Sequence, residues 1–211
     1  ISACLVGSEM CIRDRFNPMH TIVALGNPGE EYEKTRHNAG RSLMREMMKL
    51  WKLPDMVSSS KFGGQISEGT VGGREVRVFF PGTYMNDSGR AVVKIVDANV
   101  AENLIVVYDE IDLPLGEFKL SFGRGSGGHN GLKSIIENLN TPNFLRLRVG
   151  IAHRTIFGKV IRPTGDKLAD YVLGRLSSRE EHKLLSVTQT AAKALETAIV
   201  EGKEKAMSMF N

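Results

Sequence analysis

Residues 104–108 read LIVVY and are followed at once by Asp109 and Glu110. Five apolar residues in a row, with no alternation, indicate a strand that is buried on both faces, as in a parallel sheet covered by helices. Residues 20–25 form a second short apolar run, which ends in the turn GNPG at residues 26–29. Ligand sites in such sheets form at the carboxyl ends of strands, so both strand exits are candidate site positions.

The remainder of the chain alternates between helix-like and strand-like patterns. Apolar residues recur at helical spacing in residues 38–52, 88–98, 132–139 and 178–207. Further strands are expected at residues 65–71, 74–80, 117–122 and 145–152, the first two as a hairpin and the third near a sheet edge. Residues 153–166 are polar and contain Gly and Pro, which favours a loop. We predict a single α/β domain with a twisted, mixed and mostly parallel sheet flanked by helices.

The composition is that of an ordinary globular protein. The chain has 211 residues, of which 41% are hydrophobic and 25% are charged, enough for one domain with a sizeable core. No run of 18 apolar residues occurs, so we expect no membrane span and no membrane partner. The net charge of +4 is a mild hint of a partner that carries phosphate.

The first 18 residues differ from the rest of the chain. They contain both cysteines, Cys4 and Cys11, whereas none follows from Met19 onward. We interpret residues 1–18 as a non-native or disordered leader and residues 19–211 as the folded domain, with a genuine N-terminal arm as the alternative. A domain without a disulfide framework suits a reducing compartment, so we expect a cytoplasmic protein.

Two polar loops near the N-terminus carry candidate site residues. In the GNPG turn, Asn27 offers an amide that can both donate and accept hydrogen bonds, although the segment could serve only as a turn. The loop TRHNAG, residues 35–40, precedes a helix that Asn38 could cap. A helix entrance is a poor place to bury an unpaired imidazole, so His37 is a candidate general base.

Three further loops add polar groups. The loop TYMNDSG, residues 83–89, provides Asn86 for a substrate or for a turn. The acids of DEID, residues 109–112, are compatible with a metal or glycosidase site, but one carboxylate that orients a histidine is the simpler use. The loop GRGSGGHNG, residues 123–131, leads into a helix, where free backbone N–H groups bind phosphate. It lacks the Gly-Lys-[Ser/Thr] ending of a P-loop, and a flexible turn is the alternative.

Together these loops supply a base (His37), a carboxylate (Asp109) and three side-chain amides (Asn27, Asn86 and Asn130). From Met19 onward there is no nucleophilic cysteine, no Gly-x-Ser-x-Gly elbow and no metal-ligand spacing. The combination favours hydrolysis by an activated water, with amides and backbone donors holding the developing oxyanion.

The ordered motifs GNPGEEY, TRHNAG, TYMNDSG, DEIDLPLG and SGGHNGLKSI, spread over residues 26–135, resemble those of bacterial-type peptidyl-tRNA hydrolases. The resemblance implies a single α/β domain that hydrolyses the ester between a peptide, or an N-blocked aminoacyl group, and the 3′ end of tRNA. It implies release of the tRNA for reuse in translation, no metal or other cofactor, and a monomer.

The resemblance also implies roles for individual residues. The catalytic histidine falls on His37, its supporting aspartate on Asp109, and the asparagine that distinguishes peptidyl from free aminoacyl ends on Asn27. Asp109 would accept the N–H of one ring nitrogen, while the other ring nitrogen takes a proton from water. Residues expected to contact the substrate or the CCA end of tRNA are Tyr32, Asn38, Tyr84, Met85, Asn86, Gly128, His129 and Asn130.

A basic clamp for the tRNA 5′ phosphate is also implied by the resemblance, but this sequence departs from the pattern there. Arg148 matches one arm of the clamp. Ser121 stands where a lysine is expected, with Lys119 and Arg124 nearby. We take Lys119 as the candidate for the second arm, and Arg124 is the alternative.

Two other functions stay open at the level of sequence. The same scaffold could be a non-catalytic RNA-binding module, although the retained His37 and Asp109 argue against this. Alternatively, Asp109, Glu110 and Asp112 could hold magnesium in a nucleotide-phosphate hydrolase that uses the Gly-rich loop. Sensitivity to EDTA separates this last function from the others.

Overall fold

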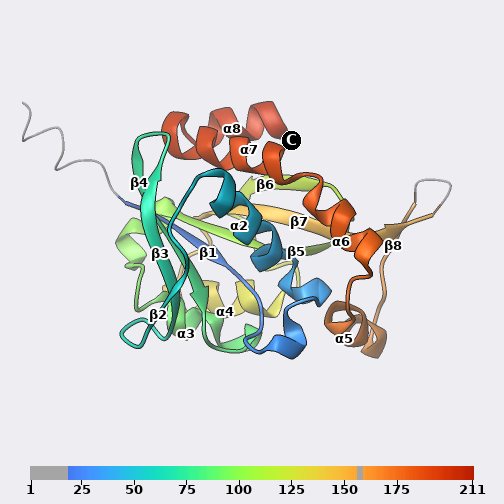
Figure 1. Ribbon diagram of the computed structural model, residues 1–211. Coiled ribbons are helices and arrows are strands. Elements are labelled where there is room, and N and C mark those ends of the chain that lie inside the picture. The colour runs from blue at the N-terminus through green and yellow to red at the C-terminus, as the bar shows by residue number, and fades with distance from the viewer. Residues whose placement is uncertain (1–18, 156–158) are drawn as a thin grey trace, which may run out of the picture.

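The computed structural model describes residues 19–155 and 159–211. In this part of the chain, one sheet has the strand order β2-β3-β4-β1-β5-β7-β6, and β8 pairs with β7. Helices cover both faces of the sheet (Figure 1). The interpretation of residues 1–18 as a leader lies outside the described residues. No described helix has the length and apolar content needed to cross a membrane.

The sheet is parallel at its centre and antiparallel at its edges. The four central strands, each parallel to its neighbour, are β4 (Arg74–Pro81), β1 (His20–Ala24), β5 (Leu104–Pro114) and β7 (Leu145–Arg154). The antiparallel strands are β2 (Val57–Ser59), β3 (Gly64–Val71), β6 (Phe118–Phe122) and β8 (Val160–Ile161). The predicted fold class, a single α/β domain with a mixed and mostly parallel sheet, is confirmed, as is the edge position of residues 117–122.

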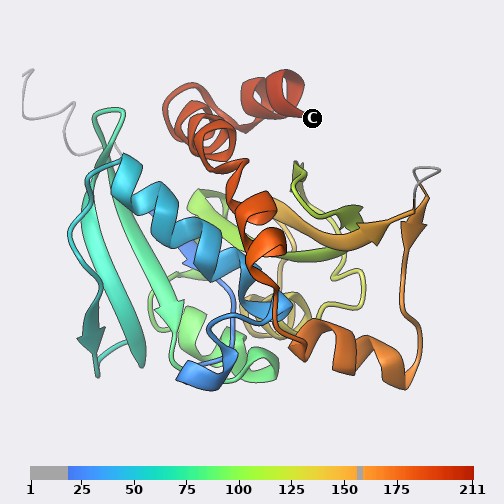
Figure 2. The ribbon, with the colours of Figure 1, turned by 45° about the vertical axis from the view of Figure 1, so that its right-hand side comes forward.

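The apolar run of β5 is buried on both faces, as predicted, and the run of β1 is buried in the same way. Alternate residues point to two cores: Ile22 and Ile105 to one, Val23 and Val106 to the other. The first core is covered by α2 (Ala39–Leu50), α6 (Ser178–Leu185), α7 (Thr188–Glu201) and α8 (Lys203–Phe210), and the second by α3 (Ser88–Val92) and α4 (Asn130–Leu139). Figure 2 shows α7 and α8 above the sheet.

The C-terminal helix prediction was wrong in one respect. Residues 178–207 form three helices rather than one, because the chain turns after Leu185 and again at Gly202. Gly202 has φ 101, a left-handed conformation that ends α7 and starts α8. The apolar spacing continues across both breaks, so periodicity alone could not locate them.

Two other segments also differ from expectation. The helix predicted for residues 88–98 ends at Val92. The loop predicted for residues 153–166 contains the end of β7, the short β8 and the start of α5 (Asp166–Leu173), while residues 156–158 lie outside the described residues. No helix was predicted at α5, which borders the cleft described below.

Candidate active site

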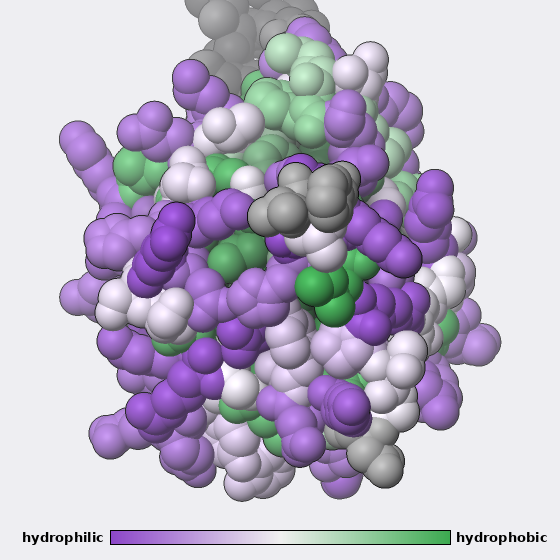
Figure 3. Space-filling model, turned by 90° about the vertical axis from the view of Figure 1, so that its right-hand side faces the viewer, coloured by the Kyte–Doolittle hydropathy of each residue, from purple (hydrophilic) through white to green (hydrophobic). Residues whose placement is uncertain are grey.

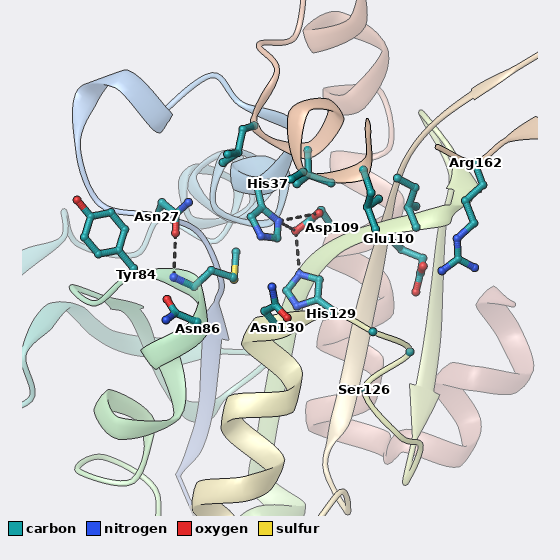
Figure 4. Close-up of a pocket in the computed structure, with 18 of the residues that line it drawn as sticks. Asn27, His37, Tyr84, Asn86, Asp109, Glu110, Ser126, His129, Asn130 and Arg162 are labelled. Atoms are coloured by element: carbon teal, nitrogen blue, oxygen red, sulfur yellow. Dashed lines mark hydrogen bonds and ion pairs between the residues drawn. The ribbon is translucent and has the colours of Figure 1, made fainter. Parts of the chain in front are cut away.

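A cleft of about 630 Å³ opens at the carboxyl ends of the central strands (Figure 4). Its walls come from the loops after β1 and β4, from β5 itself, from the Gly-rich loop before α4, and from α5. Asp109 was predicted at a strand exit, but β5 continues past it to Pro114. Seven predicted site residues outside the His37–Asp109 pair line it: Asn27, Tyr84, Met85, Asn86, Gly128, His129 and Asn130. The cleft therefore collects residues from five separate segments, as expected for the switch region of an open α/β sheet.

His37 and Asp109 are in direct contact. The Nδ1 atom of His37 lies 2.9 Å and 3.0 Å from the two carboxylate oxygens of Asp109, and both residues are buried. Asp109 directly follows the apolar run of β5, and His37 lies in the 3₁₀ helix η3 (Arg36–Asn38) that leads into α2. A Cβ added at Gly40 would lie 2.8 Å from the carbonyl oxygen of Val107, so this glycine lets α2 approach β5 closely.

A second imidazole contacts the same carboxylate. Nε2 of His129 lies 3.0 Å from Oδ1 of Asp109, while its Nδ1 accepts the backbone N–H of Leu132 at 3.3 Å and caps α4. These partners place the His129 proton on Nε2. Sequence reasoning assigned His129 to substrate binding and to a backbone donor, and missed the contact of its side chain with Asp109. Its position directly before a helix was the available signal.

Burial and the neighbouring charges shift the pKa values of Asp109 and His37 in opposite directions. Burial favours the neutral acid of Asp109, but the charges and hydrogen bonds of His37 and His129 outweigh it and hold the pKa of Asp109 far below its usual range. Burial lowers the pKa of His37, but the charge and hydrogen bond of Asp109 outweigh it and raise that pKa above its ordinary value. With its Nδ1–H donated to the ionised Asp109, neutral His37 keeps a free Nε2 that can act as a base.

Asn38 fixes Asn27 from behind. Its side-chain oxygen accepts the backbone N–H of Asn27 at 2.8 Å, and its amide nitrogen donates to the Asn27 carbonyl at 2.9 Å. Asn27 Oδ1 accepts the backbone N–H of Met85 at 2.8 Å, which turns the amide nitrogen of Asn27 into the available donor. Asn38 itself is 3% exposed, does not line the cleft and makes no side-chain cap to α2, so its connection to the cleft runs through Asn27.

The aromatic residues lie at the rim. Tyr84 is 55% exposed and lines the cleft, and Tyr32 packs edge-on against it with ring centroids 6.2 Å apart. Tyr32 does not line the cleft itself. Asn86 and Asn130 flank the entrance between Tyr84 and His129 (Figure 4). An exposed ring beside side-chain amides is a suitable surface for an unstacked base.

The predicted clamp residues lie beside the cleft rather than in it. Lys119 and Arg148 face each other across β6 and β7, so their side chains share one face of the sheet. Arg148 is bound to Glu110 at 3.1 Å, while Ser121 is buried. The fully buried Arg146 donates to the Gly125 carbonyl at 2.6 Å and thereby holds the Gly-rich loop.

His37, Asp109 and His129 could in principle hold a metal ion, because one ligand atom from each lies within 4.8 Å of the others. The hydrogen bonds do not fit that use: a metal on His129 Nε2 would move the proton to Nδ1, against the N–H of Leu132. Of the other acids in the DEID motif, Glu110 pairs with Arg148 and Asp112 with Arg162. The donor set is therefore arranged for proton transfer rather than for magnesium.

One wall of the cleft was not predicted at all. Leu168, Ala169, Val172 and Leu173 of α5 line it with an apolar surface. The spacing of Leu168 and Val172, four residues apart, was the signal for a helix face.

Seen from the side that carries α5 and β8, the molecule is mainly hydrophilic, with scattered hydrophobic patches (Figure 3).

The family model described as peptidyl-tRNA hydrolase matches residues 21–211. The chain belongs to the peptidyl-tRNA hydrolase family. It is 42% identical over 196 residues to the peptidyl-tRNA hydrolase of Bacillus pumilus, covering 92% of this chain and 98% of that one. It is 40% identical to the enzyme of Geobacillus thermodenitrificans, with coverage of 92% and 100%.

Solved structures agree with the family assignment. The crystal structure of peptidyl-tRNA hydrolase from Acinetobacter baumannii matches with a TM-score of 0.79 and 33% identity, covering 92% of this chain and 94% of that one. The resemblance stated from the five motifs is thereby confirmed.

Proposed function

We propose that this protein hydrolyses the ester bond between a peptide and the 3′ end of tRNA, with His37 as the general base. The observation that carries the proposal is the contact of His37 Nδ1 with Asp109, which leaves Nε2 of the ring free. The family supports the reaction, since the curated relatives are named peptidyl-tRNA hydrolases. A non-catalytic RNA-binding module is not favoured, because the relatives are enzymes and the base and its acid are in contact.

The chemistry follows from this pair. Nε2 of His37 removes a proton from water as the water oxygen attacks the ester carbonyl. Ionised Asp109 stabilises the imidazolium that forms and fixes the ring orientation. When the tetrahedral intermediate collapses, the bond to the ribose 3′ oxygen breaks, and the same proton passes to that leaving oxygen. The products are a free peptide acid and a tRNA with an intact 3′ hydroxyl.

Amide groups hold the reacting carbonyl and the peptide. The free amide donor of Asn27, with Asn86, Asn130 and the backbone N–H of Gly128, lies around the space beside His37. Donors of this type stabilise the oxyanion of the intermediate. The backbone N–H of His129 is not an available donor, because it donates to the Ser126 carbonyl at 3.0 Å. Amides bonded to a peptide backbone also select against a free aminoacyl end, whose charged amine would leave them unpaired.

The tRNA is bound outside the chemical centre. Tyr84, supported by Tyr32, is placed to pack against the terminal adenosine. Lys119 and Arg148 provide positive charge for the 5′ phosphate of the tRNA. The protein acts as a monomer in the cytoplasm, and it needs no metal or other cofactor. Met85 supports the site by fixing Asn27.

The direct test is release of labelled N-acetyl-aminoacyl groups from tRNA. Wild-type protein should release the label in the presence of EDTA, and His37→Ala should reduce the rate by about 10²–10⁴-fold. Full activity of His37→Ala would remove the base from this proposal. Loss of wild-type activity in EDTA would support the magnesium alternative, and tight RNA binding without release would support the non-catalytic module.

A further inference from the structure

Arg36, the residue directly before His37, points away from the cleft and is buried beneath the junction of α5 and α6. Its Nη2 atom lies 2.7 Å from Oε1 of Glu180, and Nη1 donates to the Arg175 carbonyl at 3.2 Å. Its guanidinium lies over the Tyr171 ring, 4.6 Å from the centroid. One side chain thus contacts α5, α6 and the link between them.

The backbone makes the same connection. The N–H of Arg36 donates to the Gly174 carbonyl at 3.0 Å, and the N–H of Leu176 donates to the Lys34 carbonyl at 2.8 Å. A Cβ added at Gly174 would lie 3.1 Å from Nη1 of Arg36, so the guanidinium packs directly on this link. The turn that carries His37 and the end of α5 therefore form one hydrogen-bonded unit.

This unit matters because α5 is a wall of the cleft. Leu168, Val172 and Leu173 face the cavity into which His37 opens. Tyr171, which directly precedes Val172 on α5, donates its hydroxyl to the Ile151 carbonyl of β7 at 2.8 Å. The position of the wall relative to the base thus depends on contacts made by Arg36 and Tyr171.

We propose that Arg36 is a positioning residue that sets the distance between the α5 wall and His37, and so tunes binding of the peptide end of the substrate. The inference rests on the proposed function of this cleft. Arginine suits the task because its planar fork binds a carboxylate and a carbonyl together while its face stacks on an aromatic ring. His37 keeps its own position through Asp109 and Gly40, which Arg36 does not touch.

The first test is Arg36→Gln, measured with peptidyl-tRNA. We expect kcat/KM to fall about tenfold, the equivalent of about 1.4 kcal/mol, with most of the loss in KM. Hydrogen exchange of the α5 amides, residues 166–173, should become faster. The pH at which kcat falls on acidification should be the same as in the wild type, because the His37–Asp109 contact is intact. A lower melting temperature with unchanged KM and unchanged α5 exchange would overturn the proposal.

Glu180→Gln provides a milder second variant. Glutamine can still complete the capping box with Ser177, because that motif accepts Glu or Gln, but it loses the charge that faces Arg36. We expect the same rise in KM as in Arg36→Gln, and no further rise in the double variant, because the two side chains act as one unit. Additive effects of the two substitutions would contradict the pairing. If Arg36→Gln failed to fold, an unchanged KM in Glu180→Gln alone would contradict it.

A matched control separates this effect from general destabilisation. Lys34→Gln removes the exposed pair with Glu181 on the same segment and leaves the Arg36–Glu180 pair in place. It should keep the wild-type KM, and a tenfold rise would overturn the assignment to Arg36. Failure of the proposed function is distinct, since it would appear as a wild-type protein that releases no peptide while α5 exchange still responds to Arg36→Gln.

Discussion

The two sides of the cleft are built in different ways. On one side, Asp109 lies in the central strand β5, His37 lies in η3 and Asn27 lies in the turn after β1. All three are buried and fixed by short hydrogen bonds. On the other side, α5 presents apolar side chains and is fastened through Arg36. Under the proposed function, the catalytic groups are held by the central sheet and the turns packed on it, where small displacements cost rate, and contact with a variable peptide falls to a separately attached helix.

The largest expected effect lies on the sheet side. Asp109→Asn should lower kcat by about 10³–10⁴-fold, because the amide neither fixes the right His37 tautomer nor stabilises the imidazolium. Release of N-acetyl-aminoacyl groups measures it. Glu110→Gln is the matched control, since Glu110 is the adjacent acid but pairs with Arg148, and its kcat should stay near that of the wild type. Equal losses in the two variants would contradict a specific role for Asp109.

The same substitution has a pH signature. Asp109 raises the pKa of His37, so the wild-type rate should fall as pH drops through a value above the ordinary 6.5 and the base becomes protonated. In Asp109→Asn only the lowering effect of burial remains, and the limb of the kcat profile should move to lower pH. For stability the sign is set by Asp109: its pKa is lowered on folding, so the stabilisation present above about pH 3.9 is lost as pH falls below it. Acid unfolding of the two proteins measures this.

Substitutions of Asn27 and Asn38 test whether the reaction requires the Asn27 side-chain amide to be held rigidly. Asn27→Ala should lower kcat/KM by about 10²-fold, as for loss of an oxyanion donor. Asn38→Ala should act more weakly on rate, but it leaves the backbone N–H of Asn27 without a partner and its carbonyl with Arg41 as the remaining donor. We expect it to reduce the free energy of unfolding by about 1–3 kcal/mol. Steady-state kinetics and urea unfolding distinguish the two effects. An Asn38→Ala protein with wild-type stability would contradict the role assigned to this residue.

Gly40 tests the close approach of α2 to β5. Gly40→Ala would place a methyl group against the Val107 carbonyl, and we expect a loss of about 1–3 kcal/mol in stability together with a lower kcat, because His37 moves with α2. Gly125→Ala is the control, since a Cβ there meets nothing within 4 Å and its φ is not left-handed. Thermal unfolding and kcat of both variants provide the measurement, and similar effects in both would contradict the argument.

The smallest expected effect lies outside both walls, at Lys119 and Arg148. Lys119→Gln should raise KM only severalfold and should reduce the dependence of log KM on log salt by about one unit of slope, because one phosphate contact is lost. The rate at saturation should not change. Lys133→Gln, an exposed change on α4 whose partner is Glu137, serves as the control for a general loss of charge. A salt dependence equal to that of the wild type would exclude Lys119 from the clamp.

The sequence was sufficient to predict the sheet side of the cleft. Asp109 follows an unbroken apolar strand, and His37 and Asn27 lie in polar turns beside helices and strands, so local patterns mark each of them. The contact of His129 with Asp109 depends on how the Gly-rich loop folds back over β5, which no local pattern encodes. The α5 wall lies more than 120 residues after His37 and reaches it through Arg36 and Gly174, a tertiary pairing that periodicity cannot reveal.

The eleven residues of β5 point alternately to the two faces of the sheet, and they contribute to both the core and the cleft. Val106 and Tyr108 belong to the core beneath α4, whereas Asp109 lies beside Val149 of β7 and faces His37. Side chains alternate along a strand, so a slip of one residue against β7 would carry Asp109 to the opposite side and leave His37 without its acid. The register in which β5 pairs with β7 during folding therefore determines whether Asp109 contacts His37. A compact molecule with a shifted register would lack this contact and would be inactive.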